Sequence, residues 1–84
     1  MNMNEPASVT DRLRSAKTSL AREDYVAARD QYEILAGLGS KEALLALGYI
    51  YERGGNGVTK DYSTARYWLE RSWSEGRGPV RIFV

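Results

Sequence analysis

Apolar and small residues recur every three or four positions along most of the chain, with polar residues between them. Such spacing predicts α-helices, because one face of a helix returns every 3.6 residues. Four such faces can be traced in chain order: Leu13, Ala16, Leu20 and Ala21; Ala28, Tyr32, Leu35, Ala36 and Gly39; Ala43, Leu44, Leu47, Gly48 and Tyr51; and Ala65, Trp68, Leu69, Ser72 and Trp73. The pattern therefore predicts four short helices and an all-α fold.

A residue suited to capping a helix precedes each of these faces. Ser8 or Thr10 can cap the first helix, and Asp24, Ser40 and Asp61 can cap the other three. Each offers a side-chain oxygen to the backbone N–H groups that the first turn of a helix leaves without partners. Glycine pairs follow the second and fourth faces, where they favour the end of a helix.

The two halves of the chain repeat one another. A shift of 37 residues aligns 24–39 with 61–76 at six identical positions. A shift of 31 aligns the first face with the third, so that Ala16 falls on Leu47. Extra loop residues around 54–59 account for the difference between the two shifts. The repeat predicts two helix–turn–helix units that bury their apolar faces by stacking on one another.

Residues 43–76 read AxxxLGYxYxxGxxGVxKDYxxARxWLxxSxxxG, which resembles a Sel-one-like repeat, a relative of the tetratricopeptide repeat. The likeness rests on Ala43, Leu47, Gly48, Tyr51, Gly54, Gly57, Val58, Lys60, Asp61, Tyr62, Ala65, Trp68 and Gly76. Residues 12–39 resemble a plainer tetratricopeptide-like unit. The resemblance implies an α-solenoid, a short right-handed αα-superhelix made of two stacked helix–turn–helix repeats.

On this basis we expect three segments. A flexible N-terminus spans 1–9, a repeat domain spans 10–78 with units at about 10–39 and 40–76, and an apolar tail spans 79–84. Three interpretations of the tail stay open. It can be a loosely packed end, a hydrophobic plug over the last helix pair, or a surface for self-association.

The segment RGGNGVTKDY at 53–62 raises the question of a phosphate-binding loop. Such a loop leads from a strand into a helix and places Lys beside Ser or Thr. Here the preceding element is helical, and Lys60 is followed by Asp61, whose charge would repel a phosphate at the helix start. We therefore interpret the glycines as residues that supply positive φ angles to a connector.

Composition narrows the possible chemistry. The chain has 84 residues, a net charge of +1 and neither Cys nor His, so thiolates, disulfides and the commonest general base are missing. The balanced charge argues against nucleic-acid binding, and no apolar run approaches the ~18 residues of a membrane span. Carboxylate pairs such as Glu23 with Asp24 are interpreted as a helix cap and solvated surface. We expect a soluble, cytoplasmic, non-enzymatic protein without cofactor or metal ion.

The resemblance also implies where a partner would bind. In repeats of this type the first helix of each unit lines a concave groove. The predicted partner-binding positions are Glu42, Leu45, Tyr49 and Glu52 in the second unit, and Arg14 and Thr18 in the first, with Asp11 and Ala21 beside them. We expect these positions to recognise another protein or a peptide.

Two functions stay open at this point. The first, implied by the resemblance, is an adaptor that binds a partner protein through the groove or the open end. The alternative is a structural module that self-associates into a homo-oligomer or forms part of a longer solenoid. Among the aromatic residues, Tyr51, Trp68 and Trp73 are expected to pack between helices, which leaves Tyr49 as the aromatic contact for a partner.

Overall fold

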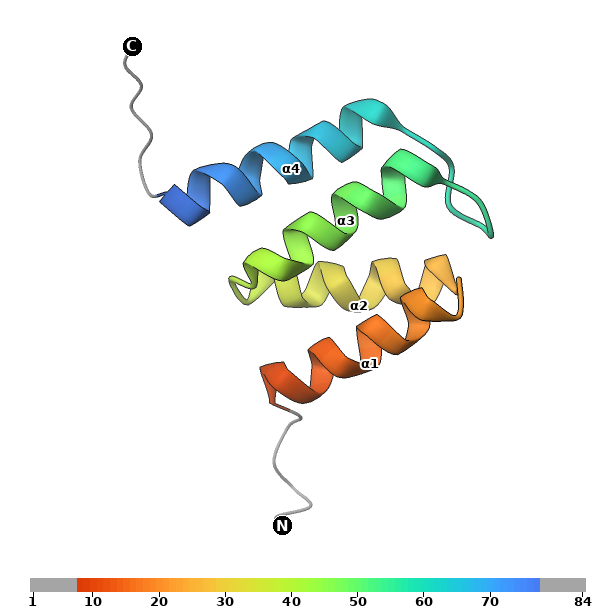
Figure 1. Cartoon of the computed structure of the whole chain (residues 1–84), viewed down its shortest axis with the longest axis horizontal. Helices are drawn as coiled ribbons and strands as arrows, with labels where there is room; N and C mark the ends of the chain where they lie inside the picture. The colour runs from red at the N-terminus through yellow and green to blue at the C-terminus, as the bar shows by residue number, and fades with distance from the viewer. Residues whose placement is uncertain (1–7, 78–84) are drawn as a thin grey trace.

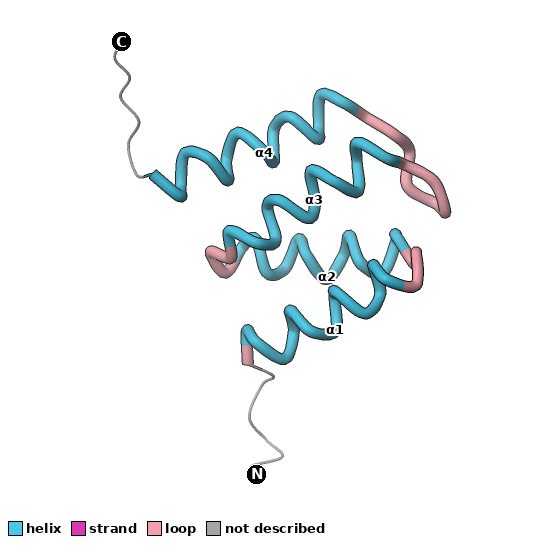
Figure 2. Tube along the Cα trace, viewed as in Figure 1, coloured by secondary structure: helices cyan, strands magenta, loops and turns pink. Residues whose placement is uncertain are grey.

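The structure is a computed structural model that describes residues 8–77. It contains four helices, α1 (Val9–Ala21), α2 (Tyr25–Gly37), α3 (Lys41–Arg53) and α4 (Tyr62–Arg77). Each helix runs antiparallel to the one before it, so the chain forms two helical hairpins in succession (Figures 1 and 2). The predicted all-α fold of two helix–turn–helix units is confirmed. The predicted tail at 79–84 lies outside the described residues.

The predicted caps begin the helices. The side chains of Ser8, Asp24 and Ser40 accept hydrogen bonds from the backbone N–H groups three residues on, at 3.1, 3.3 and 3.2 Å. Asp61 accepts from two backbone N–H groups at the start of α4, at 3.0 and 3.2 Å. Because Ser8 is the cap, α1 starts at Val9, one residue before the predicted start of the repeat domain.

The helices pack in sequence order, α1 on α2, α2 on α3 and α3 on α4. The two middle helices have a neighbour on each side, so they supply most of the core. The largest fully buried side chains are Tyr32, Leu35, Leu44, Leu47 and Ile50. The outer helices α1 and α4 are each covered on one side by their hairpin partner. No helix among residues 8–77 is long and apolar enough to cross a membrane.

Four residues of the predicted faces are exposed. They are Trp73 at 63 %, Leu69 at 38 %, Ala21 and Gly39. Ile50, which none of the predicted faces included, is fully buried. Tyr51 and Trp68 are half-buried and pack against the core, as predicted. The error at Trp73 has a physical reason, since that side of α4 turns away from α3.

Gly48 lets α3 and α4 approach closely where they cross. A Cβ atom at this position would lie 2.6 Å from both Cγ and Cδ2 of Leu69. Real side chains do not approach so closely, so the position excludes any residue with a Cβ unless Leu69 moves. Ala65 of α4 is also buried, at 3 % exposure.

The structure corrects the alignment of the first and third helices by one residue. The caps Ser8 and Ser40 are 32 residues apart, and α1 and α3 both contain 13 residues. At a shift of 32, the buried Ala16 of α1 corresponds to the buried Gly48 of α3. The predicted shift of 31 is wrong because it matched apolar residue types instead of equivalent positions on the helix.

Candidate partner-binding groove

A hollow of about 470 Å³ opens between α1 and α3. It is lined by residues from α1, from the turn after it and from α2 and α3: Lys17, Leu20, Ala21, Glu23, Tyr25 and Tyr49. A second hollow of about 230 Å³ lies along α1 and is lined by Thr10, Leu13, Arg14 and Lys17. Because Lys17 lines both hollows, they are adjacent, and we call the two together the groove.

An ion pair joins α1 to α3 across the groove. The Nζ atom of Lys17 lies 2.8 Å from Oε2 of Glu42. Both side chains are about half exposed, so water weakens the pair and its contribution to stability is small. The Glu42 carboxylate does balance the positive charge of Lys17, and Lys17 lies where the two hollows meet.

Arg53 holds the aromatic residues at the far end of the groove. Its Nε atom donates a hydrogen bond to the Tyr25 hydroxyl at 3.1 Å, and its guanidinium lies 5.4 Å from the centre of the Tyr49 ring. The hydrogen bond to Tyr25 raises the pKa of the Arg53 guanidinium, a group that is charged at neutral pH in any case. Tyr49 is positioned by this cation–π contact yet remains 44 % exposed, so much of its ring faces solvent.

The structure brings part of the predicted site together. Tyr49 lines the larger hollow, and Glu42 reaches Lys17 across the groove. Leu45 is 47 % exposed, and Glu52 is exposed on the same helix. Sequence reasoning missed Lys17 because of the shift of 31. The corrected shift of 32 makes Lys17 the counterpart of Tyr49 and would have placed it in the groove.

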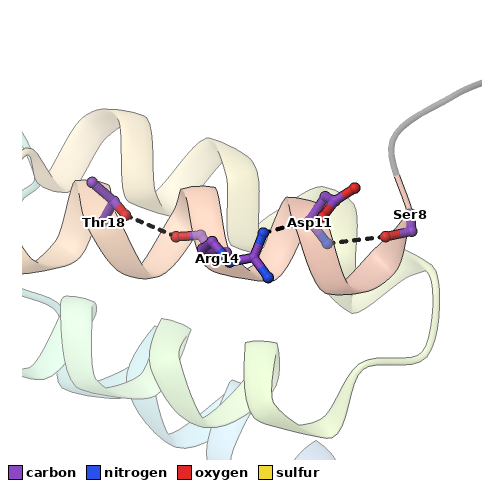
Figure 3. Close-up of polar contacts among 4 residues, drawn as sticks. All are labelled: Ser8, Asp11, Arg14 and Thr18. Atoms are coloured by element: carbon purple, nitrogen blue, oxygen red, sulfur yellow. Dashed lines mark hydrogen bonds and ion pairs between the residues drawn. The ribbon is translucent and has the colours of Figure 1, made fainter. Parts of the chain in front are cut away.

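The two predicted site residues of the first unit lie in a row of polar side chains along α1. Figure 3 shows Ser8, Asp11, Arg14 and Thr18 in a row along α1. Nη1 of Arg14 lies 3.2 Å from Oδ1 of Asp11, and the Thr18 hydroxyl donates to the Arg14 carbonyl at 3.0 Å. Arg14 also lines the smaller hollow, whereas Thr18 lines neither part of the groove.

This row gives α1 a polar outer face. At a shift of 32, Asp11 and Thr18 correspond to Ala43 and Ile50 of α3, which are both fully buried. Ala43 and Ile50 lie roughly 150° around α3 from Gly48, which faces α4, so they pack on the first unit. In α1 the same positions are polar and exposed. This face of α1 is therefore suited to contact with water and not to packing on another helix pair.

The loop at 54–61, which joins α3 to α4, packs on the first unit. The Asn56 side-chain amide donates a hydrogen bond to the Glu23 carbonyl at 2.8 Å, in the turn between α1 and α2. A Cβ atom at Gly57 would lie 2.6 Å from Cγ2 of Val26 on α2. The loop therefore holds the second unit against the first.

The same loop has the predicted connector geometry. Gly54, Gly55 and Gly57 have φ angles of 67°, 106° and 95°, as expected of glycines in a tight connection. Asp61 already accepts hydrogen bonds from the backbone N–H groups at the start of α4. A phosphate at this helix start would have to compete with that carboxylate for the same donors.

Comparison with known families concerns the second unit. Residues 41–76 match the family model described as Sel1 repeat, a range that runs from the start of α3 into the last turn of α4. Sel1 repeats generally mediate protein–protein interactions and are typically non-catalytic scaffolds. No match to the chain was found among curated proteins or among solved structures.

Proposed function

We propose that the chain, whose residues 41–76 form a Sel1 repeat, is an adaptor that binds another protein through the groove. The observation that carries the proposal is the hollow of about 470 Å³ beside Tyr49. An exposed aromatic ring at the edge of a concave surface is a frequent hot spot of protein interfaces. Leu20 adds apolar surface to the same hollow.

The groove favours a peptide segment with one large apolar side chain as its anchor. The hollow gives that side chain a place between Leu20 and Tyr49. Charges of both signs surround it, with Glu23 in the lining and Arg53 beside the Tyr49 ring. Such charges select the orientation of a bound segment more than they add to its affinity.

A double variant tests this proposal. Leu45→Asp with Tyr49→Ala changes Tyr49, which lines the groove, and Leu45, an exposed residue one turn before it on α3. Both side chains are exposed, so the fold should survive, which circular dichroism would verify. The matched control is Tyr67→Ala, because Tyr67 is 52 % exposed but lies on α4. Proteins captured by the wild type and the control, and identified by mass spectrometry, should be lost with the double variant.

Affinity measurements with a captured partner complete the test. Loss of a hot-spot aromatic residue costs on the order of 2 kcal/mol or more, so the groove variant should bind at least about 30-fold more weakly. Full retention of every partner by the Leu45→Asp, Tyr49→Ala variant would falsify the groove as the binding surface.

A further inference from the structure

One face of α4 lacks the cover that the equivalent face of α2 has. The shift of 37 pairs three buried residues of α2 with three exposed residues of α4. Exposed fractions in α2 are 5 % for Tyr25, 2 % for Tyr32 and 4 % for Ala36; in α4 they are 64 % for Tyr62, 38 % for Leu69 and 63 % for Trp73. The difference arises because α3 covers α2, whereas no helix among residues 8–77 follows α4. We call the α4 surface of Tyr62, Arg66, Leu69 and Trp73 the open face; Leu69 lies at its edge, because its side chain also packs against Gly48 of α3.

The N-terminal end of another copy does not suit the open face. Within the chain, the second unit packs on the first through apolar residues such as Ala43 and Ile50. The counterparts of these two residues in α1 are Asp11 and Thr18, which are exposed and polar. A head-to-tail stack of copies would therefore press polar side chains onto Trp73, without replacing the contacts seen inside the chain.

We propose that the open face of a second copy covers this one, with the two α4 helices antiparallel around a two-fold axis. A hollow of about 330 Å³ on α4 is lined by Tyr62, Ser63 and Arg66. The axis lies midway between Tyr62 and Trp73 along the helix. Trp73 of each copy then reaches the hollow beside Tyr62 of the other. Such an interface is self-complementary, because each copy supplies one protruding side chain and one hollow.

Charge supports the same arrangement. Arg66 and Glu70 lie on either side of that midpoint, so an antiparallel pairing sets Arg66 of each copy near Glu70 of the other. Both side chains are exposed, and neither takes part in an ion pair between residues that the structure describes. The two-fold pairing thus brings opposite charges together twice, whereas a parallel pairing would set like charges side by side.

The size of the contact sets the expected strength. One pair of helices buries less than the ~1,200 Å² of a standard interface, so the dimer should be weak and reversible. A dissociation constant on the order of 100 µM is expected. This surface lies on α4 and is separate from the groove, so failure of one proposal does not affect the other.

Sedimentation equilibrium of the 84-residue chain between about 10 µM and 1 mM tests the dimer. The wild type should pass from monomer to dimer in this range. Trp73→Ala should weaken association at least about 10-fold, because the residue contributes to two symmetric contacts. Tyr67→Ala, a similarly exposed aromatic change on another side of α4, should associate like the wild type.

Charge reversal tests the antiparallel geometry without removing apolar surface. Arg66→Glu and Glu70→Arg should each weaken self-association, because like charges then face each other across the axis. An equimolar mixture of the two variants should associate at least as tightly as the wild type, since every facing pair is then opposite in sign. A strict monomer at 1 mM, oligomers larger than a dimer, or a mixture no tighter than its components would each overturn the proposal.

Discussion

Asn56 and Glu23 meet across the two units, and both have left-handed backbone conformations. Their φ angles are 52° and 62°, and they are the residues other than glycine with positive φ in the described part of the chain. The Asn56 amide donates to the Glu23 carbonyl at 2.8 Å. The turn at 22–24 and the loop at 54–61 thus each contain one non-glycine residue with a positive φ angle. A hydrogen bond joins these two residues.

Replacement of Asn56 should separate its two roles. Asn56→Gly keeps the positive φ angle and loses the hydrogen bond, so the free energy of unfolding should fall by about 1 kcal/mol. Alanine adopts the left-handed conformation less readily than glycine, so Asn56→Ala should lower the free energy of unfolding by about 1 kcal/mol more. Urea denaturation measures both values. Equal stability of the two variants would show that backbone conformation is unimportant here.

Gly48 and Gly37 should respond to alanine in opposite directions. In Gly48→Ala the new Cβ meets Leu69, so the free energy of unfolding should fall by about 1–3 kcal/mol. Gly37 lies in the last turn of α2 with no heavy atom within 4 Å of an added Cβ. Gly37→Ala should therefore raise stability by up to about 1 kcal/mol through helix propensity. Thermal and urea melts measure the change in stability of each variant. Changes of the same sign and size would contradict the close approach of α3 and α4 at Gly48.

The polar N-terminal end can be changed to resemble the face of α3 that packs on the first unit. Asp11→Ala, Ser15→Leu and Thr18→Ile install the residues found at the equivalent positions of α3. The triple variant should add head-to-tail contacts and form oligomers larger than a dimer at about 100 µM, through newly exposed apolar surface. Analytical ultracentrifugation detects them. A variant that behaves like the wild type would argue against the shift of 32.

Acid should weaken the start of α4. Hydrogen bonds from the Thr64 hydroxyl and the backbone of Thr64 and Ser63 lower the pKa of Asp61 below its ordinary value of 3.8. Its stabilising effect is therefore present above that value and is lost as the pH falls through the lower pKa of the folded state. Asp61→Ala should melt at a lower temperature than the wild type at pH 6, and the gap should shrink by pH 2. A gap independent of pH would exclude a role for the charge.

Local signals predicted the elements well. Ser40 and Asp61 were predicted as caps from residue type and position alone, because capping depends on a single side chain and the turn that follows it. The buried face of α2 was also predicted, since its apolar spacing is regular. These features depend on interactions within a few residues of the chain.

Features that depend on distant contacts were not predicted. The shift between α1 and α3 was wrong by one residue because Leu13 and Leu20 are apolar without occupying the positions of Leu44 and Tyr51. Trp73 was assigned to the core because periodicity shows that a face is apolar, and not whether a neighbour covers it. The bond from Asn56 to Glu23 spans 33 residues, and no local pattern indicates it.

The loop at 54–61 also has a consequence for modularity. Its Asn56 amide requires a carbonyl that belongs to another unit, and Gly57 sits against the side chain of Val26. A unit with this loop is therefore incomplete when excised, whereas the first unit ends its own turn in three residues, 22–24. Transplanting α3 and α4 onto a foreign solenoid would succeed only where the preceding turn presents a free carbonyl at the position of Glu23. The turns of the units therefore help to determine which unit can follow which along such a chain.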